Sequence, residues 1–411
     1  MKSLVDRNIP FGRELFGELG DVTLVDGREV DERFPGLADY DVLAIRSVTR
    51  VTPDVIDRAQ SCRVIATATI GTDHIDTAHV RRVNAAGERG ITVISAPGSN
   101  ADSVADYVWY ALGSLTSGAD GCLRARTLGI IGYGNCGSRV AGRARGFGMR
   151  VLRHDPPLAE REPGFDSDAL ADVLKADFVS LHVPLTGPEE SRYPTRHMIG
   201  AAELAAMRPE AYLLNSSRGA VVDSGALAAA LGEGAIAGAV LDVYEGEPEP
   251  PEELIRLPEL ATPHIAGYAV EGKRRGAVVI YEAACRALGV EPVDTSGVMA
   301  RGFAPPQGQQ VGFDGAGAEA TAADRAVRAL LRATYDIEAT SAELKATLGR
   351  EDRGALFDHM RREHGRHELA VYRVGFGGSV AGPLRERIGR RLEGFGVQVA
   401  GQDAHYVLHA R

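Results

Sequence analysis

A ten-residue stretch, LGIIGYGNCG from Leu128 to Gly137, constrains the fold more than any other part of the chain. An apolar run ends there in a glycine-rich loop, and a helix-compatible segment, Ser138 to Phe147, follows. Gly132 permits a tight turn after a strand, Gly134 lets the backbone approach a pyrophosphate, and Gly137 lets a helix pack close to a sheet. This is the pattern of a βα turn that binds phosphates at a helix N-terminus, where unpaired N–H groups and the helix dipole favour anions.

The residues after the loop favour a dinucleotide site over an empty glycine-rich turn. A second apolar run, Met149 to Leu152, leads to Asp155, about twenty residues beyond the loop, where a carboxylate can accept hydrogen bonds from both ribose hydroxyls. Such an acid favours NAD, because it would repel the 2′-phosphate of NADP. Arg153 argues against this preference for NAD over NADP, since an arginine in this loop can pair with the 2′-phosphate.

Alternating strands and helices predict an α/β protein with two tandem doubly wound parallel sheets, each covered on both faces. The first series of predicted strands is Ser3–Val5, Val22–Val25, Val42–Ile45, Val64–Ala68 and Ile91–Ile94. The second series, after the glycine loop, is Phe178–Leu181, Tyr212–Asn215, Ala237–Leu241 and a short run that ends near Thr262.

A break near Ala96-Pro97-Gly98 and a return helix from Glu271 to Leu288 predict that the first domain is discontinuous. Residues 1–97 and 272–295 would then form a flavodoxin-like substrate domain. Residues 98–271 would form a Rossmann-type nucleotide domain inserted into it. Ligands of such proteins bind at the carboxyl ends of the strands.

The chain changes character beyond Pro292. Residues 296–320 are rich in Gly, Pro, Gln and Ala and are predicted to be a linker. Residues 321–411 are predicted to form a small α+β C-terminal domain. The predicted helices and strands of this domain are Asp324–Tyr335, Leu356–Arg362, Glu368–Val374, Pro383–Glu393, Val397–Ala400 and Tyr406–His409.

Composition excludes several classes of protein. The net charge of −10 argues against a nucleic-acid surface, so an anionic substrate must be met by a local group of cations. No apolar stretch has membrane-spanning length and the N-terminus lacks a signal-peptide pattern, which predicts a cytoplasmic protein without membrane association. The four cysteines contain no Cys-x-x-Cys pair, so neither a metal site nor a disulfide framework is expected.

Three residues in the second unit have the types and positions expected of catalytic groups: Arg218, Glu247 and His264. Each lies beyond the end of a predicted strand, where α/β enzymes place functional side chains. The planar guanidinium of Arg218 suits a substrate carboxylate. A carboxylate beside His264 would orient the imidazole and favour its charged form, as an acceptor of a hydroxyl proton requires. Taken singly, each could instead be an ordinary loop residue.

In chain order, GYGNCG, Asp155, LHVPLT, NSSRGAVVD, LDVYEGEP and PHIAGY resemble the D-2-hydroxyacid dehydrogenases over residues 1 to about 290. The resemblance implies that Arg218 binds the substrate carboxylate, His264 is the acid/base and Glu247 supports His264. It also implies further substrate-binding residues, Ser47, Thr69 and Tyr268, although the first two could be turn hydroxyls that bond their own backbone. The implied NAD-binding residues, besides the three loop glycines, are Asn135, Cys136, Asp155, Val183, Ser216, Ser217, Asp242 and Gly267.

The segments LVDRNIPFGRELF, AIRSVTRV, TATIGTDHID and FDHMR narrow the resemblance to one branch of this family. That branch oxidises 4-phospho-D-erythronate to 2-oxo-3-hydroxy-4-phosphobutanoate in pyridoxal 5′-phosphate synthesis and forms homodimers through its C-terminal domain. For the substrate phosphate we expect Arg46, with Arg361 or Arg366 of a second subunit as further candidates. The alternatives are D-3-phosphoglycerate dehydrogenase, another D-2-hydroxyacid dehydrogenase, or an NAD-sensing binding protein like the co-repressors of this fold.

Overall fold

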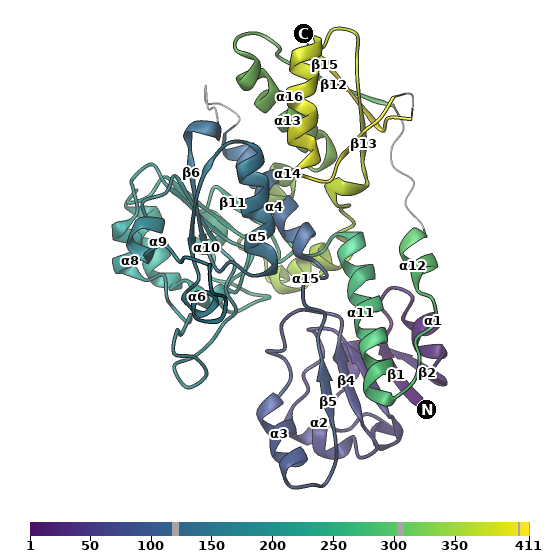
Figure 1. Ribbon diagram of the computed structural model, residues 1–411. Helices are drawn as coiled ribbons and strands as arrows, with labels where there is room; N and C mark the ends of the chain where they lie inside the picture. Colours follow the sequence, from purple (N-terminus) through teal and green to yellow (C-terminus); the bar gives the residue numbers. More distant parts are fainter. Residues whose placement is uncertain (117–122, 302–307, 402, 411) are drawn as a thin grey trace. The chain divides into compact units, whose positions relative to one another are not determined.

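The chain forms two compact units in the computed structural model, which describes residues 1–116, 123–301, 308–401 and 403–410 (Figure 1). Unit 1 comprises Met1–Asn100 and Val270–Phe303, and unit 2 comprises Ala101–Ala269 and Ala304–Arg411. Unit 1 is thus assembled from two separate stretches of chain. The domain boundaries given above stay predictions. No helix among the described residues is long and apolar enough to cross a membrane.

Unit 1 is built on a five-stranded parallel sheet of order β2-β1-β3-β4-β5, which is the flavodoxin-like order. Its strands are β1 (Lys2–Asp6), β2 (Asp21–Val25), β3 (Val42–Ile45), β4 (Val64–Thr67) and β5 (Thr92–Ile94). The accompanying helices are α1 (Gly12–Gly17), η1 (Gly27–Glu29), η2 (Leu37–Asp39), α2 (Pro53–Arg58), α3 (Thr77–Ala85), α11 (Val270–Leu288) and α12 (Ser296–Ala300). Every residue of β3 and β4 is buried, because apolar clusters cover both faces of the sheet.

Unit 2 contains a six-stranded parallel sheet of order β11-β10-β9-β8-β6-β7. Its strands are β6 (Thr127–Ile131), β7 (Arg150–His154), β8 (Phe178–Leu181), β9 (Tyr212–Asn215), β10 (Gly238–Leu241) and β11 (Leu260–Ala261). The accompanying helices are α4 (Ala101–Leu115), η3 (Leu123–Ala125), α5 (Asn135–Gly146), α6 (Pro156–Arg161), α7 (Leu170–Val173), α8 (Ala201–Ala206), η4 (Gly219–Val221), α9 (Ser224–Gly232) and α10 (Glu253–Arg256). The strand order reverses at β6, so the glycine loop lies at a topological switch point, where α/β sheets bind ligands.

The C-terminal part of unit 2 adds a four-stranded sheet of order β12-β15-β13-β14, in which all pairs are parallel. Its strands are β12 (Gln309–Phe313), β13 (Arg373–Phe376), β14 (Gln398–Val399) and β15 (Tyr406–Ala410). Its helices are α13 (Glu319–Thr334), α14 (Ile337–Lys345), α15 (Arg353–Glu363), η5 (Leu369–Val371) and α16 (Gly382–Glu393). Figure 1 shows α13 and α16 beside α4 and α5, and these helices are in contact.

Two features of the C-terminal part differ from the sequence expectation. The stretch expected to be a linker, residues 296–320, contains α12, β12 and the start of α13, although residues 302–307 lie outside the described part. Alternate side chains of β12, Val311 and Phe313, are buried, and this period of two is the signal that the Gly- and Gln-rich composition obscured. Helix α14 is not among the predicted elements; it covers the edge of β11, where the Ala261 N–H donates to Ser341 Oγ at 3.0 Å.

A buried polar cluster connects α4 to the C-terminal segment, and it corrects one expectation. Arg366 lies 6% exposed and donates to the carbonyls of Ser103 and Ala266 at 3.1 and 2.9 Å. Its guanidinium also faces the rings of Tyr110 and Tyr335. Because this cation is enclosed by its own chain, the expectation that Arg366 binds a substrate phosphate in a second subunit was wrong.

Gly137 is the point at which α5 packs against the glycine loop. A Cβ at Gly137 would lie 2.0 Å from the Gly132 carbonyl oxygen, whereas a Cβ at Gly142, in the same helix, would meet no atom within 4 Å. We expect Gly137→Ala to lower the free energy of unfolding by about 1–3 kcal/mol. Gly142→Ala is the matched control and should raise it by up to about 1 kcal/mol. Thermal unfolding measures both, and equal midpoints would contradict this account of the loop.

Candidate active site

The β6–α5 loop has the geometry that a pyrophosphate site requires. Gly132 has a φ of +89°, and a Cβ there would lie 2.7 Å from the His182 carbonyl carbon. Gly134 is the N-cap of α5 and has no side-chain cap, and a Cβ on it would meet no atom within 4 Å. The first turn of α5, with Asn135 and Cys136, therefore begins beside open space, as an anion-binding helix N-terminus does. The expected NAD-binding residues of this loop lie together.

Asp155 lies at the end of β7, next to the glycine loop. Its Oδ2 accepts from the Tyr133 N–H at 2.7 Å, and its Oδ1 caps α6 through the Leu158 N–H at 2.9 Å. A carboxylate has about four acceptor positions, so these two bonds leave it able to accept from a ribose. Arg153 faces the rings of Tyr133 and Phe165 at 5.3 and 4.9 Å, which directs its charge towards aromatic faces.

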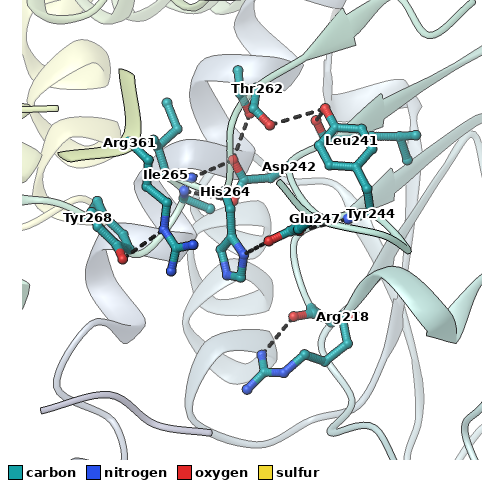
Figure 2. A network of polar contacts seen from close by, with 12 residues as sticks. Arg218, Leu241, Asp242, Tyr244, Glu247, Thr262, His264, Ile265, Tyr268 and Arg361 are labelled. Carbon is teal, nitrogen blue, oxygen red and sulfur yellow. Dashed lines mark hydrogen bonds and ion pairs between the residues drawn. The ribbon is translucent and has the colours of Figure 1, made fainter. Parts of the chain in front are cut away.

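The three expected catalytic residues follow β9, β10 and β11, which are neighbouring parallel strands. His264 Nδ1 lies 2.7 Å from Glu247 Oε2, and Glu247 Oε1 accepts from the Tyr244 N–H at 2.9 Å (Figure 2). His264 has a φ of +55°, an uncommon conformation for this residue type that the surrounding hydrogen bonds hold in place. The structure thus pairs the imidazole with the carboxylate, and the pair leaves Nε2 as the ring nitrogen that can take up a proton.

The charge of Glu247 is favoured by its neighbours. Burial alone would raise the pKa of Glu247, but the charge and hydrogen bond of His264 and the Tyr244 N–H together lower this pKa below its usual value. Arg361 contributes in the same direction. Glu247 is therefore ionised at neutral pH and can stabilise a positive imidazole.

Arg218 is positioned by close packing of its loop against the Glu247 loop. A Cβ at Gly219 would lie 2.0 Å from the Tyr244 carbonyl carbon, so only a glycine fits between the two segments. Asn215 Nδ2 donates to the Arg218 carbonyl at 2.9 Å, and Arg218 Nη1 donates to the Ser217 carbonyl at 2.8 Å. Figure 2 shows the Arg218 side chain below the His264–Glu247 pair.

Asp242 has a different environment from the one expected of a cofactor-binding residue. Its side chain is 1% exposed; Oδ1 accepts from Thr262 Oγ1 and from the Ile265 N–H at 2.7 and 2.8 Å, and Oδ2 accepts from the Ala266 N–H at 2.8 Å. Burial raises the pKa of Asp242 to about 6, against the opposing charge of His264 and these hydrogen bonds. The carboxylate thus fixes both sides of the His264 loop.

The remaining cofactor candidates are spread along the same sheet edge. Ser217 bonds to Asn215 through its N–H and its hydroxyl, and Ser216 Oγ is buried. Val183 packs against the core after β8, and Gly267 lies in the His264 loop. Sequence reasoning missed His182, which is partly buried and bonds to Ser180 Oγ at 2.9 Å; burial of its ring lowers its pKa to about 4, so the ring is neutral.

The substrate candidates of unit 1 also lie at a sheet edge. Arg46 and Ser47 follow β3, and Thr69 follows β4, its neighbour. Thr69 Oγ1 bonds to Thr67 Oγ1 at 2.7 Å and to the Gly71 carbonyl at 3.2 Å, so the turn-hydroxyl interpretation describes part of its role. Arg46 Nε lies 3.2 Å from Oδ2 of Asp6, which is 1% exposed.

Tyr268 is hydrogen-bonded to an arginine of its own chain, which the sequence did not indicate. Arg361, in α15, donates from Nε to Tyr268 Oη at 2.8 Å. The sequence suggested that this arginine would come from a second subunit, but α15 of the same unit brings it to Tyr268 and Glu247, because Phe357 anchors the helix in the core. The FDHMR segment carried the residue but gave no sign of where it would pack.

Comparisons with known proteins agree with the geometry. Residues 104–266 match the family described as D-isomer specific 2-hydroxyacid dehydrogenase, NAD binding domain. The Erythronate-4-phosphate dehydrogenase of Salinibacter ruber is 48% identical over 298 residues, which cover 71% of this chain and 73% of that protein. The protein of the same name from Azotobacter vinelandii is 39% identical over 382 residues, which cover 92% of this chain and 96% of that protein.

Two solved structures share the fold. The TT0316 protein from Thermus thermophilus is 31% identical with a TM-score of 0.57, over 72% of this chain and 99% of that one. The D-lactate dehydrogenase from Aquifex aeolicus, solved with NAD and lactic acid, is 26% identical with a TM-score of 0.55, over 70% of this chain and 96% of that one.

The glycine loop, the switch point and the arginine, glutamate and histidine at one sheet edge define an NAD-dependent D-2-hydroxyacid dehydrogenase. The relative from Azotobacter vinelandii, which is 39% identical and matches nearly end to end, narrows the family to which the chain is assigned. The chain belongs to the erythronate-4-phosphate dehydrogenase family.

The hydrogen bonds of Asp242 predict the effect of an isosteric change. In Asp242→Asn, one acceptor oxygen becomes an amide group that cannot accept, so we expect a loss of about 1–3 kcal/mol in unfolding free energy and a lower kcat. The raised pKa means that the folded wild type gains a proton here before the unfolded chain does, so this contribution to stability grows as the pH falls from about 6 to 3.8 and is absent in the variant. Thermal unfolding at pH 8 and pH 5 measures how much less stable the variant is than the wild type. If this gap in unfolding free energy does not widen at pH 5, the raised pKa is contradicted.

Proposed function

We propose that this protein oxidises 4-phospho-D-erythronate to 2-oxo-3-hydroxy-4-phosphobutanoate with NAD as hydride acceptor, in the synthesis of pyridoxal 5′-phosphate. The single observation that carries the reaction type is the hydrogen bond of 2.7 Å between His264 and Glu247 in the same unit as the glycine loop. The relatives named Erythronate-4-phosphate dehydrogenase support the choice of substrate.

The proposed roles follow from the chemistry of each side chain. Arg218 pairs with the substrate carboxylate and draws electron density from the neighbouring carbon. His264 Nε2 accepts the proton of the C2 hydroxyl while the C2–H bond breaks, and the C2–O bond becomes a carbonyl. Glu247 stabilises the imidazolium that forms. NAD, held by the glycine loop and Asp155, would supply the acceptor for the hydride that leaves C2.

The other binding residues stay proposals. For NAD these are Gly132, Gly134, Asn135, Cys136, Gly137, Asp155, Val183, Ser216, Ser217 and Gly267. For Asp242, which was also expected to bind NAD, we propose a positioning role, since it is buried and its carboxylate bonds to the His264 loop. For the substrate we propose Ser47, Thr69 and Tyr268. Arg46 is a weaker phosphate ligand than its sequence position suggested, because a buried carboxylate already balances its charge.

We further propose that the protein is a homodimer through its C-terminal part, as the family resemblance implies. Edge strands support this proposal, since β12 and β14 end the C-terminal sheet and Val399 of β14 is 49% exposed. A molar mass in solution equal to that of one 43.6 kDa chain would overturn it.

The proposed function is tested by following the absorbance of reduced nicotinamide. We expect turnover with NAD and 4-phospho-D-erythronate, and a kcat/KM at least about tenfold lower with D-3-phosphoglycerate. This ratio corresponds to a site that favours the longer acid by about 1.4 kcal/mol in the transition state. A preference for D-3-phosphoglycerate would show that the proposed substrate is wrong, while the proposed reaction type, oxidation of a 2-hydroxy acid, would still hold. Absence of hydride transfer to every 2-hydroxy acid tried would instead favour an NAD-sensing binding protein.

The proposed pair predicts separable effects of two substitutions. His264→Ala should reduce kcat by about 10²–10⁴-fold while NAD still binds, because only the proton acceptor is lost. Glu247→Gln keeps a hydrogen-bond partner but removes the charge, so a loss of about 10²-fold is expected. Steady-state kinetics and NAD titration measure both. A His264→Ala enzyme with near-normal kcat would refute the assignment.

A further inference from the structure

Helix α15 is fixed against the segment that carries Glu247. Phe357 is fully buried, and its ring meets the ring of Tyr244 edge-on, with centroids 6.0 Å apart. Nearly one turn earlier, a Cβ at Gly354 would lie 2.7 Å from Glu249 Oε1, so the helix backbone approaches this segment closely. The docking depends on shape and gives α15 a defined position beside the catalytic residues.

Arg361 lies four residues after Phe357, on the same side of α15. Its Nε donates to Tyr268 Oη at 2.8 Å, and its guanidinium carbon lies 5.1 Å from the centre of the Tyr268 ring (Figure 2). Burial disfavours the charge, but Tyr268 and Glu247 together raise the pKa of Arg361 above its usual value. The arginine is therefore a permanent cation held in one orientation.

Two cations flank the proton acceptor in this unit. Figure 2 shows Arg361 to the left of the His264 ring and Arg218 below it, with Glu247 on the right. The proposed substrate carries a carboxylate on one side of its reacting carbon and a phosphate two carbons away on the other. Its two anionic ends therefore match the two arginines, with the C2 hydroxyl opposite His264.

We propose that Arg361 binds the substrate phosphate and thereby selects a phosphorylated four-carbon acid. The identity of the substrate in this proposal rests on the proposed function. The planar fork of a guanidinium suits two phosphate oxygens. Tyr268 then acts as the support that orients the guanidinium. The cation comes from the same chain as His264, so the contact does not require a second subunit.

The test compares a ligand with the phosphate and one without it. For Arg361→Gln we expect the Michaelis constant for the substrate, 4-phospho-D-erythronate, to rise about 10- to 100-fold, since a charge-assisted contact is lost. The inhibition constant of D-erythronate, which lacks the phosphate, should rise at least about tenfold less. Arg361→Lys keeps a charge but not the fork, and should recover part of the loss.

The neighbouring Arg362 provides the matched control. It lies in the same helix, is exposed and pairs with Glu363 at 3.6 Å, so Arg362→Gln should leave both constants unchanged. Thermal unfolding and NAD titration show whether each variant is folded. Equal losses for both ligands in Arg361→Gln, or no loss, would overturn the proposal.

The proposed function can fail while the proposed role of Arg361 still holds. If the wild type oxidises D-3-phosphoglycerate in place of 4-phospho-D-erythronate, the same comparison is made between phosphoglycerate and D-glycerate. A selective loss for the phosphorylated acid would still support Arg361 as the phosphate ligand, while an equal loss for both acids would overturn it.

Discussion

The arrangement of the active site depends on one buried carboxylate. Asp242 ends β10 and accepts hydrogen bonds from the Thr262 hydroxyl and from two backbone N–H groups of the loop that carries His264. Ionised groups are costly to bury unless they are hydrogen-bonded, and here three donors offset part of that cost. The loop is thereby fixed in the conformation that gives His264 its positive φ. The distance between the imidazole and Glu247 follows from this anchor.

The cofactor end and the catalytic end of unit 2 share one physical solution, which is close backbone approach at glycine. Gly137 lies against the Gly132 carbonyl, and Gly219 lies against the peptide that joins Tyr244 to the next residue. In both places a side chain would separate two loops that must meet. The parallel sheet beneath brings successive loops to one edge, and the glycines let them pack there without a gap.

Sequence reasoning anticipated the parts of the site that local pattern determines. The glycine spacing identified the β6–α5 turn, and the positions of Arg218, Glu247 and His264 after consecutive strands predicted that they would share an edge. Both inferences need only the period of the strands and the rule that parallel strands end at the same edge.

What sequence reasoning missed depends on packing between segments far apart in the chain. The roles of Asp242 and Arg361 arise from donors and aromatic rings that no spacing rule places beside them. Similarly, the Gly- and Gln-rich composition of the segment hid the short apolar alternation in β12. Helix α14 packs on β11, an edge strand that was expected only as a short apolar run.

The contact between Phe357 and Tyr244 has a consequence for how the enzyme matures during synthesis. A chain leaving the ribosome exposes Arg218, Glu247 and His264 well before α15. Until that helix emerges, the Glu247 loop lacks the ring that packs beneath it, and Tyr268 lacks its arginine. A nascent or prematurely terminated chain can therefore contain all three proposed catalytic residues and still have an unsupported site. The C-terminal segment thus couples completion of the polypeptide to completion of the active site.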